Sequence, residues 1–196
     1  MADILIAIAL AYLFIHLFLF FVVSRLLVPF LGFSKEPMPK TIPAQIKKKI
    51  DEIKRRTKSK SEFTKESFYF LSKRYKSLWF HTLIRMDIVF LRDLEKIWVQ
   101  KDFLPCNSHN YLLRIFLVKS GYYDDNQIEI RHGFLNFGIH QYLRVYDGKK
   151  SFDLDLWGNT IGVPMGRHAS MFKSSSLITD VQEVMRNIRK IKRKNR

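Results

Sequence analysis

Apolar residues run without a charge or a proline from Ile4 to Val23, a stretch of twenty residues. At about 1.5 Å of rise per residue, a helix of this length crosses the hydrocarbon core of a bilayer. The stretch lacks the basic start and the small-residue cleavage site of a signal peptide. The pattern therefore predicts an uncleaved transmembrane anchor. His16, inside it, is interpreted as a helix-contact imidazole, with a proton relay or a ligand as the alternative.

Three later segments repeat apolar residues at helical spacing. The first begins near Thr41, a candidate N-cap, and predicts a basic amphipathic helix. Its apolar stripe consists of Ile42, Ile46, Ile50 and Ile53. Residues 63–99 mix aromatic and basic side chains and predict two further helices. Near the C-terminus, Thr179 and Gln182 have the spacing of a capping box and open another basic amphipathic segment.

A buried helix of about fourteen residues is predicted to begin at or beside Cys106, the single cysteine of the chain. Asn107 and Ser108 are residue types that favour helix starts. The run from Tyr111 to Val118 is almost wholly apolar, and Gly121 follows it as a stop signal.

Farther on, LNFGIHQYLRVYDGKKSFDLDLWG alternates apolar and polar residues with a period of two on both sides of an Asp-Gly pair. This pattern predicts a β-hairpin with a tight turn at Asp147 and Gly148. The cross-strand pairs that follow from this turn are Tyr146 with Lys149, Tyr142 with Asp153 and His140 with Asp155. Side chains of directly paired residues lie on one face of the sheet.

Together these elements predict an α+β fold in which N-terminal helices precede a small antiparallel sheet, on one N-terminal transmembrane helix. The expected segments are an anchor at 1–32, a basic linker with an amphipathic helix at 33–61, a folded domain at 62–170 and a basic C-terminal helix at 171–196.

The charge distribution changes the expected partners. Of the net charge of +16, a surplus of seven lies in residues 35–60 and a surplus of six in residues 171–196, while residues 61–170 are nearly balanced. A nucleic-acid-binding domain would carry its basic surface on the folded body, and the aromatic residues of 63–99 are interpreted as core rather than as base-stacking groups. Basic flanks beside an anchor favour anionic lipid headgroups, with solvated, solubilising faces as the alternative.

Orientation follows from the same residues. The segment after the apolar stretch is rich in Lys and Arg, whereas the only charged side chain before the stretch is that of Asp3. The positive-inside rule therefore predicts a single-pass protein whose C-terminal domain is cytoplasmic. One cysteine permits no internal disulfide, which agrees with a reducing compartment.

Candidate chemistry centres on Cys106. A thiol at a helix start faces the positive end of the helix dipole and free backbone N–H groups, which favour a thiolate and can stabilise an oxyanion. A nucleophilic thiolate needs a base, and that base needs an orienting acid. The hairpin offers His140 as the base and Asp155 as the acid, with Asp153 as the competitor on the same face.

This order of elements resembles the transglutaminase-like cysteine peptidase superfamily. The family pattern is a Cys opening a helix that ends in Gly, a strand with His followed two residues later by an aromatic residue, and a strand with Asp. Here these are Cys106 in CNSHNYLLRIFLVKSGY, His140 in HQY and Asp155 in FDLDLWG. The resemblance covers roughly residues 100–160. The chain departs from the common pattern in Leu104 and Pro105 before Cys106, in Tyr142 for Trp and in Leu156 for Pro.

The resemblance implies a papain-like core that acts on a peptide or protein amide without a cofactor. Cys106 would attack the carbonyl, His140 would move the proton and Asp155 would orient the imidazole. Gln100, six residues before Cys106, resembles an oxyanion glutamine, with a structural helix end as the alternative. A zinc site of Cys106, His109, His140 and Asp155 is a further alternative.

A rival function comes from another class. The departures from the family pattern are compatible with a catalytically inactive transglutaminase-like scaffold or binding module at the membrane surface.

Overall fold

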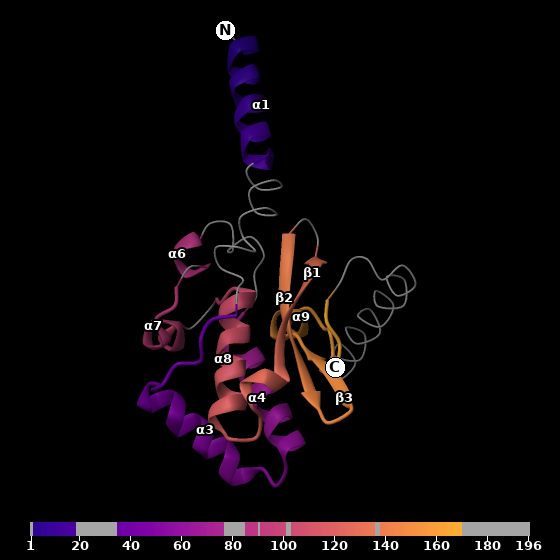
Figure 1. The fold of residues 1–196 in the computed structure, drawn as a ribbon. Coiled ribbons are helices and arrows are strands. Elements are labelled where there is room, and N and C mark those ends of the chain that lie inside the picture. The colour runs from indigo at the N-terminus through magenta and orange to yellow at the C-terminus, as the bar shows by residue number, and fades with distance from the viewer. Residues whose placement is uncertain are drawn as a thin grey trace, which may run out of the picture.

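In a computed structural model, the chain is described over residues 2–18, 35–76, 85–89, 91–100, 103–135 and 138–169. Its helices are α1 (Ala2–Phe18), α3 (Ala44–Arg56), α4 (Lys60–Arg74), α6 (Met86–Val89), α7 (Leu94–Val99), α8 (Cys106–Lys119), the 3-10 helix η2 (Asp125–Gln127) and α9 (Leu156–Thr160). Its strands are β1 (Ile128–Leu135), β2 (Gly138–Asp147) and β3 (Lys150–Leu154). All the described helices except α9 precede a small antiparallel sheet (Figure 1), which confirms the α+β class.

The first part of the predicted anchor is helical. In α1 the apolar side chains are exposed, as Ile4 and Phe14 illustrate at 64% and 71%. Of the helices that the structure describes, none combines the length and the apolar character that crossing a bilayer requires. Residues 19–23 of the predicted span and the helix predicted from Thr179 lie outside the described residues.

Helix α3 carries the predicted apolar stripe, and Ile46, Ile50 and Ile53 are buried. Its N-cap is Pro43 and not Thr41, so Ile42 precedes the helix and is partly buried. Proline suits a helix start because its φ angle is fixed near the helical value and its missing N–H would have no intrahelical partner there.

The prediction of two helices within residues 63–99 is wrong in detail. Helix α4 starts earlier, at Lys60, where the Ser59 side chain caps it by accepting from Glu62 N–H. The short helices α6 and α7 follow, and α7 is opened by Asp93, whose carboxylate accepts from the N–H groups of Glu95 and Lys96. Both caps satisfy N–H groups that have no intrahelical partner at a helix start, so α4 begins after Ser59 and α7 begins after Asp93.

Helix α8 begins at Cys106 and ends at Lys119, as predicted. It contacts α3, α4, α9 and β2, and it lies beside the sheet in Figure 1. Its apolar side chains belong to the hydrophobic core. Its fully buried apolar residues are Leu112, Leu113, Ile115, Phe116 and Leu117. A helix buried on several sides keeps a fixed position, and the nucleophile candidate stands at its first residue.

The sheet has the order β1-β2-β3, and its hairpin register corrects the prediction. Asp147 pairs with Lys150 and Tyr146 with Ser151, so the turn residues are Gly148 and Lys149. Gly148 has φ of +61°, a left-handed conformation that glycine adopts at no steric cost.

The true register is displaced by two residues from the predicted one. Asp153 consequently lies opposite Arg144 and not opposite Tyr142. Because side chains alternate with a period of two, a shift of two keeps every side chain on its expected face. The predicted pairing of His140 with Asp155 across the hairpin is wrong, since β3 ends at Leu154. Asp155 approaches His140 by another route, as the N-cap of α9.

Candidate active site

Cys106 is the first residue of α8 and is partly exposed. Its N-cap residue is Pro105, whose ring offers no acceptor to the first N–H groups of the helix. Those groups and the helix dipole therefore create a positive potential at the sulfur, which stabilises a thiolate or a nearby oxyanion.

The helix that carries Cys106 is tied to the strand that carries His140. Asn110, one turn into α8, donates from Nδ2 to the backbone carbonyl of Gln141 at 2.7 Å and contacts the Gln141 side-chain oxygen at 3.3 Å. Both residues are about 2% exposed. A buried amide bonded in this way holds the helix and the strand in one relative position, because breaking the contact would leave polar groups unpaired.

His140 lies on β2 and is only 3% exposed. Its Nε2 lies 2.7 Å from Asp155 Oδ2, and its ring packs against Trp157 at a centroid distance of 5.3 Å. Since Asp155 occupies Nε2, Nδ1 is the ring nitrogen left for the thiol. The carboxylate fixes the tautomer and the ring orientation, and Trp157 fixes the plane.

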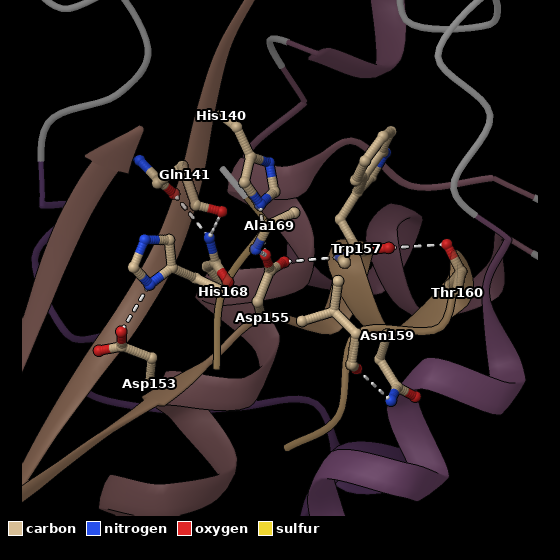
Figure 2. A network of polar contacts seen from close by, with 12 residues as sticks. His140, Gln141, Asp153, Asp155, Trp157, Asn159, Thr160, His168 and Ala169 are labelled. Carbon is tan, nitrogen blue, oxygen red and sulfur yellow. Dashed lines mark hydrogen bonds and ion pairs between the residues drawn. The ribbon is translucent and has the colours of Figure 1, made fainter. Parts of the chain in front are cut away.

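Asp155 is 1% exposed and accepts three hydrogen bonds. Besides His140, one donor is Gly158 N to Oδ1 at 2.7 Å. The other is Ala169 N to Oδ2 at 2.8 Å (Figure 2). A Cβ atom at position 158 would lie 2.5 Å from Oδ2, so glycine there lets the carboxylate sit against the helix start. The buried charge is compensated by well-placed donors, as such a site requires.

The protonation of His140 reflects these neighbours. Burial by itself lowers the pKa of His140, but the charge and hydrogen bond of Asp155, together with the hydrogen bond and charge of Cys106, outweigh burial and raise the pKa to about 10. Asp155 and Cys106 therefore both favour the charged form of the imidazole. Cys106, His140 and Asp155 form one connected site.

Asp153, the competing acid, has other partners. Its carboxylate accepts from Arg144 Nε at 2.7 Å and from His168 Nδ1 at 2.6 Å. Burial by itself would raise the pKa of Asp153, but hydrogen bonds from Arg144 and His168 lower it below its usual range. Within the described residues, the hydrogen-bonded acid of His140 is Asp155 and not Asp153.

His109, one turn after Cys106 in α8, is fully buried. Neither of its ring nitrogens has a hydrogen-bond partner among the described residues, and its ring lies 5.6 Å from that of Tyr75. Desolvation, aided by the charge of His140 and opposed by that of Asp155, lowers the pKa of His109 to about 3. Across the described ranges no group of three or more His, Cys, Asp or Glu side chains is placed to hold a metal ion, so the zinc alternative gains no support.

Gln100 is the C-cap residue of α7 and is half-buried. Within the part of the chain that the structure describes, it makes no hydrogen bond to Cys106 or His140. The structure thus brings together three of the four predicted site residues and places Gln100 at a helix end, the position of the structural alternative.

Four site groups were not predicted from the sequence: the Trp157 ring, the N–H groups of Gly158 and Ala169, and the His168 imidazole. For Gly158 a signal existed, because Asp155 followed three residues later by Gly158 has the spacing of an N-cap and its bonded N–H. His168 and Ala169 are brought to the site only by the path of the chain after α9, and no local pattern marks them.

Comparisons of the chain with known protein families, with curated proteins and with solved structures find no match.

Proposed function

We propose that this chain is a membrane-anchored thiol enzyme with a transglutaminase-like, papain-like core that acts on peptide or protein amides through a Cys106 acyl-enzyme. The observation that carries the proposal is the buried 2.7 Å contact between His140 and Asp155, with the Cys106 thiol at the start of α8 among the groups that raise the pKa of the same imidazole. No cofactor is required by this chemistry.

In this proposal acylation begins from a thiolate–imidazolium pair, in which His140 holds the proton given up by the thiol. The sulfur of Cys106 attacks the amide carbonyl carbon, and the carbonyl oxygen becomes an oxyanion beside the N–H groups that open α8. The C–N bond then breaks, the leaving amine takes the proton from His140, and a thioester on Cys106 remains.

Deacylation would use His140 in the reverse sense. The neutral imidazole accepts a proton from water or from an acceptor amine as the oxygen or nitrogen attacks the thioester. Expulsion of the thiolate gives a carboxylic acid in the first case and a new amide in the second. Asp155 stabilises the imidazolium in both half-reactions without itself taking the proton.

The thiol provides the direct test. We expect iodoacetamide to alkylate Cys106 at pH 7 about tenfold faster than free cysteine, because the helix start and His140 favour the thiolate. Mass spectrometry of the full chain measures the rate. An acyl-enzyme trapped with an activated ester and identified by mass would extend the test to catalysis.

Cys106→Ser, which leaves the chain without a thiol, is the control for adduct assignment. A rate and pH profile equal to those of free cysteine would contradict the enzymatic proposal. That result would favour the inactive scaffold at the membrane surface.

Membrane attachment is proposed on two features. Helix α1 exposes its apolar side chains from Ile4 to Ile15, and α3 buries one isoleucine face while exposing a basic one. The exposed basic residues of α3 are Lys47, Lys48, Lys54, Arg55 and Arg56. Such a face suits anionic headgroups. No nucleic-acid partner is proposed.

The proposed topology is single-pass with the domain in the cytoplasm. We expect protease added to intact cells or spheroplasts to leave the domain uncut and to digest it after lysis, since the basic residues follow the apolar stretch. Immunoblotting for the domain measures protection, and a periplasmic or extracellular protein serves as the accessibility control. Digestion of the domain from outside intact cells would reverse the orientation.

A further inference from the structure

The segment Gly166–Ala169, called the strap below, contacts both aspartates at the end of β3. Gly166 N–H donates to the Asp153 carbonyl at 3.0 Å, and the φ of Gly166 is +94°, which a side chain would disfavour. His168 Nδ1 donates to the Asp153 carboxylate at 2.6 Å. The next N–H, that of Ala169, donates to Asp155 Oδ2 at 2.8 Å (Figure 2). The strap is thus attached to Asp153 and reaches Asp155.

His168 is held on two sides. Its ring is stacked on Tyr142 at a centroid distance of 4.1 Å and an interplanar angle of 1°. Its partner Asp153 is fixed in turn by Arg144, through bonds of 2.7 and 3.1 Å. The His168 side chain is only 13% exposed, so its contact with Asp153 is largely shielded from water.

We propose that His168 is a positioning residue for the His140–Asp155 pair: anchored on Asp153, it keeps the Ala169 N–H on the carboxylate oxygen that also bonds His140. The catalytic meaning of this role rests on the proposed function, but the positioning itself does not. His168 touches neither the thiol nor the reacting carbonyl in this scheme and is not a catalytic residue.

The reason lies in covalent geometry and in the hydrogen bonds that Asp155 Oδ2 accepts. A side chain fixed at one residue constrains the planar peptide that follows it, so the His168–Asp153 bond limits the movement of the Ala169 N–H. Oδ2 of Asp155 accepts from both His140 and Ala169, whereas Oδ1 accepts from Gly158. Without the strap, water would replace the Ala169 donor and compete with the imidazole for Oδ2.

Two substitutions of His168 separate the contribution of its hydrogen bond to Asp153 from that of its stacking on Tyr142. His168→Phe keeps a ring to stack on Tyr142 but loses the donor, whereas His168→Asn keeps a donor at the position of Nδ1 and loses the stack. Both are made in the full chain in detergent micelles. Amide hydrogen exchange at Ala169 and exchange of the His140 ring N–H are followed by NMR after 15N labelling of alanine and histidine.

In His168→Phe we expect both protons to exchange about tenfold to a hundredfold faster than in the wild type, and in His168→Asn we expect rates within about threefold of it. Cys106 alkylation should slow in the Phe variant and recover in the Asn variant. Unchanged exchange in His168→Phe would overturn the proposal, as would an equal increase in both variants, which would assign the role to the ring.

If circular dichroism shows that His168→Phe is unfolded, Asp153→Ala removes the same bond from its other end and should give the same increase. The hydrogen-exchange rates of Ala169 and His140 measure the effect of the strap independently of the reactivity of the thiol. A wild-type Cys106 with ordinary reactivity would therefore defeat the proposed function while leaving the positioning role to be judged on the exchange rates.

Discussion

Asp155→Asn is expected to slow acyl-enzyme formation by about a hundredfold to ten-thousandfold with the fold retained. An amide has no charge to stabilise the imidazolium of His140, and its NH2 group would face the two donors that now bond Oδ2. At Oδ1, an asparagine oxygen can still accept from Gly158 N and cap α9. The rate is measured by nitrophenolate release from p-nitrophenyl acetate and by the mass of the adduct.

Asp153→Asn is the matched control, since it makes the same chemical change two residues away. Its side-chain oxygen can still accept from His168, so we expect a rate within about threefold of the wild type. Circular dichroism of both variants verifies folding. Equal losses in the two variants, or a larger loss in Asp153→Asn, would remove Asp155 from the role of orienting acid.

Acid unfolding is the second large effect, and it arises from His109. The pKa of His109 is about 3 in the fold and about 6.5 in an unfolded chain, so the unfolded state binds one more proton between these values. This group therefore stabilises the fold fully above pH 6.5, and that stabilisation is lost as the pH falls toward 3. We expect the free energy of unfolding to drop by about 2 to 3 kcal/mol between pH 6.5 and pH 4.5.

Urea unfolding of the full chain in detergent, followed by circular dichroism at each pH, measures this slope. His109→Phe keeps a ring beside Tyr75 and cannot be protonated, so its slope between pH 6.5 and pH 4.5 should be nearly flat. His132→Phe, at an exposed position on β1, should keep the wild-type slope. An unchanged slope in His109→Phe would show that other groups cause the acid sensitivity.

At alkaline pH the sign reverses because of His140. Its folded-state pKa of about 10 lies above the unfolded value, so its contribution is complete below pH 6.5 and is lost as the pH rises toward 10. The two histidines together place maximum stability near pH 6.5, and His109→Phe should alter only the acid side of the profile.

Local patterns in the sequence were enough to place the helix that begins at Cys106 and the hairpin that follows it. Both are short-range features: a cap, an apolar run and a glycine stop define the helix, and strict alternation around an Asp-Gly pair defines the hairpin. The side of the sheet that carries His140 also followed, because a period of two is insensitive to a register error of two residues.

Only the tertiary structure determined which aspartate bonds His140 and which element brings that aspartate to the imidazole. Asp153 and Asp155 are the same residue type, and the alternation of the strand predicts both on the same face of the sheet. The sequence pattern predicts a hairpin but did not identify its turn residues, which are Gly148 and Lys149. The distinction arises because Arg144 and His168 occupy Asp153, whereas the start of α9 turns Asp155 toward the imidazole.

Local sequence patterns also could not predict which side chains of the site are buried and what they contact. The isolation of His109, the packing of Trp157 on His140 and the arrival of Ala169 at Asp155 all depend on segments far apart in the chain. A sequence specifies near neighbours through backbone preference and periodicity, but the desolvation and partners of a side chain depend on the whole packed core, which forms only when α8, the sheet and α9 come together.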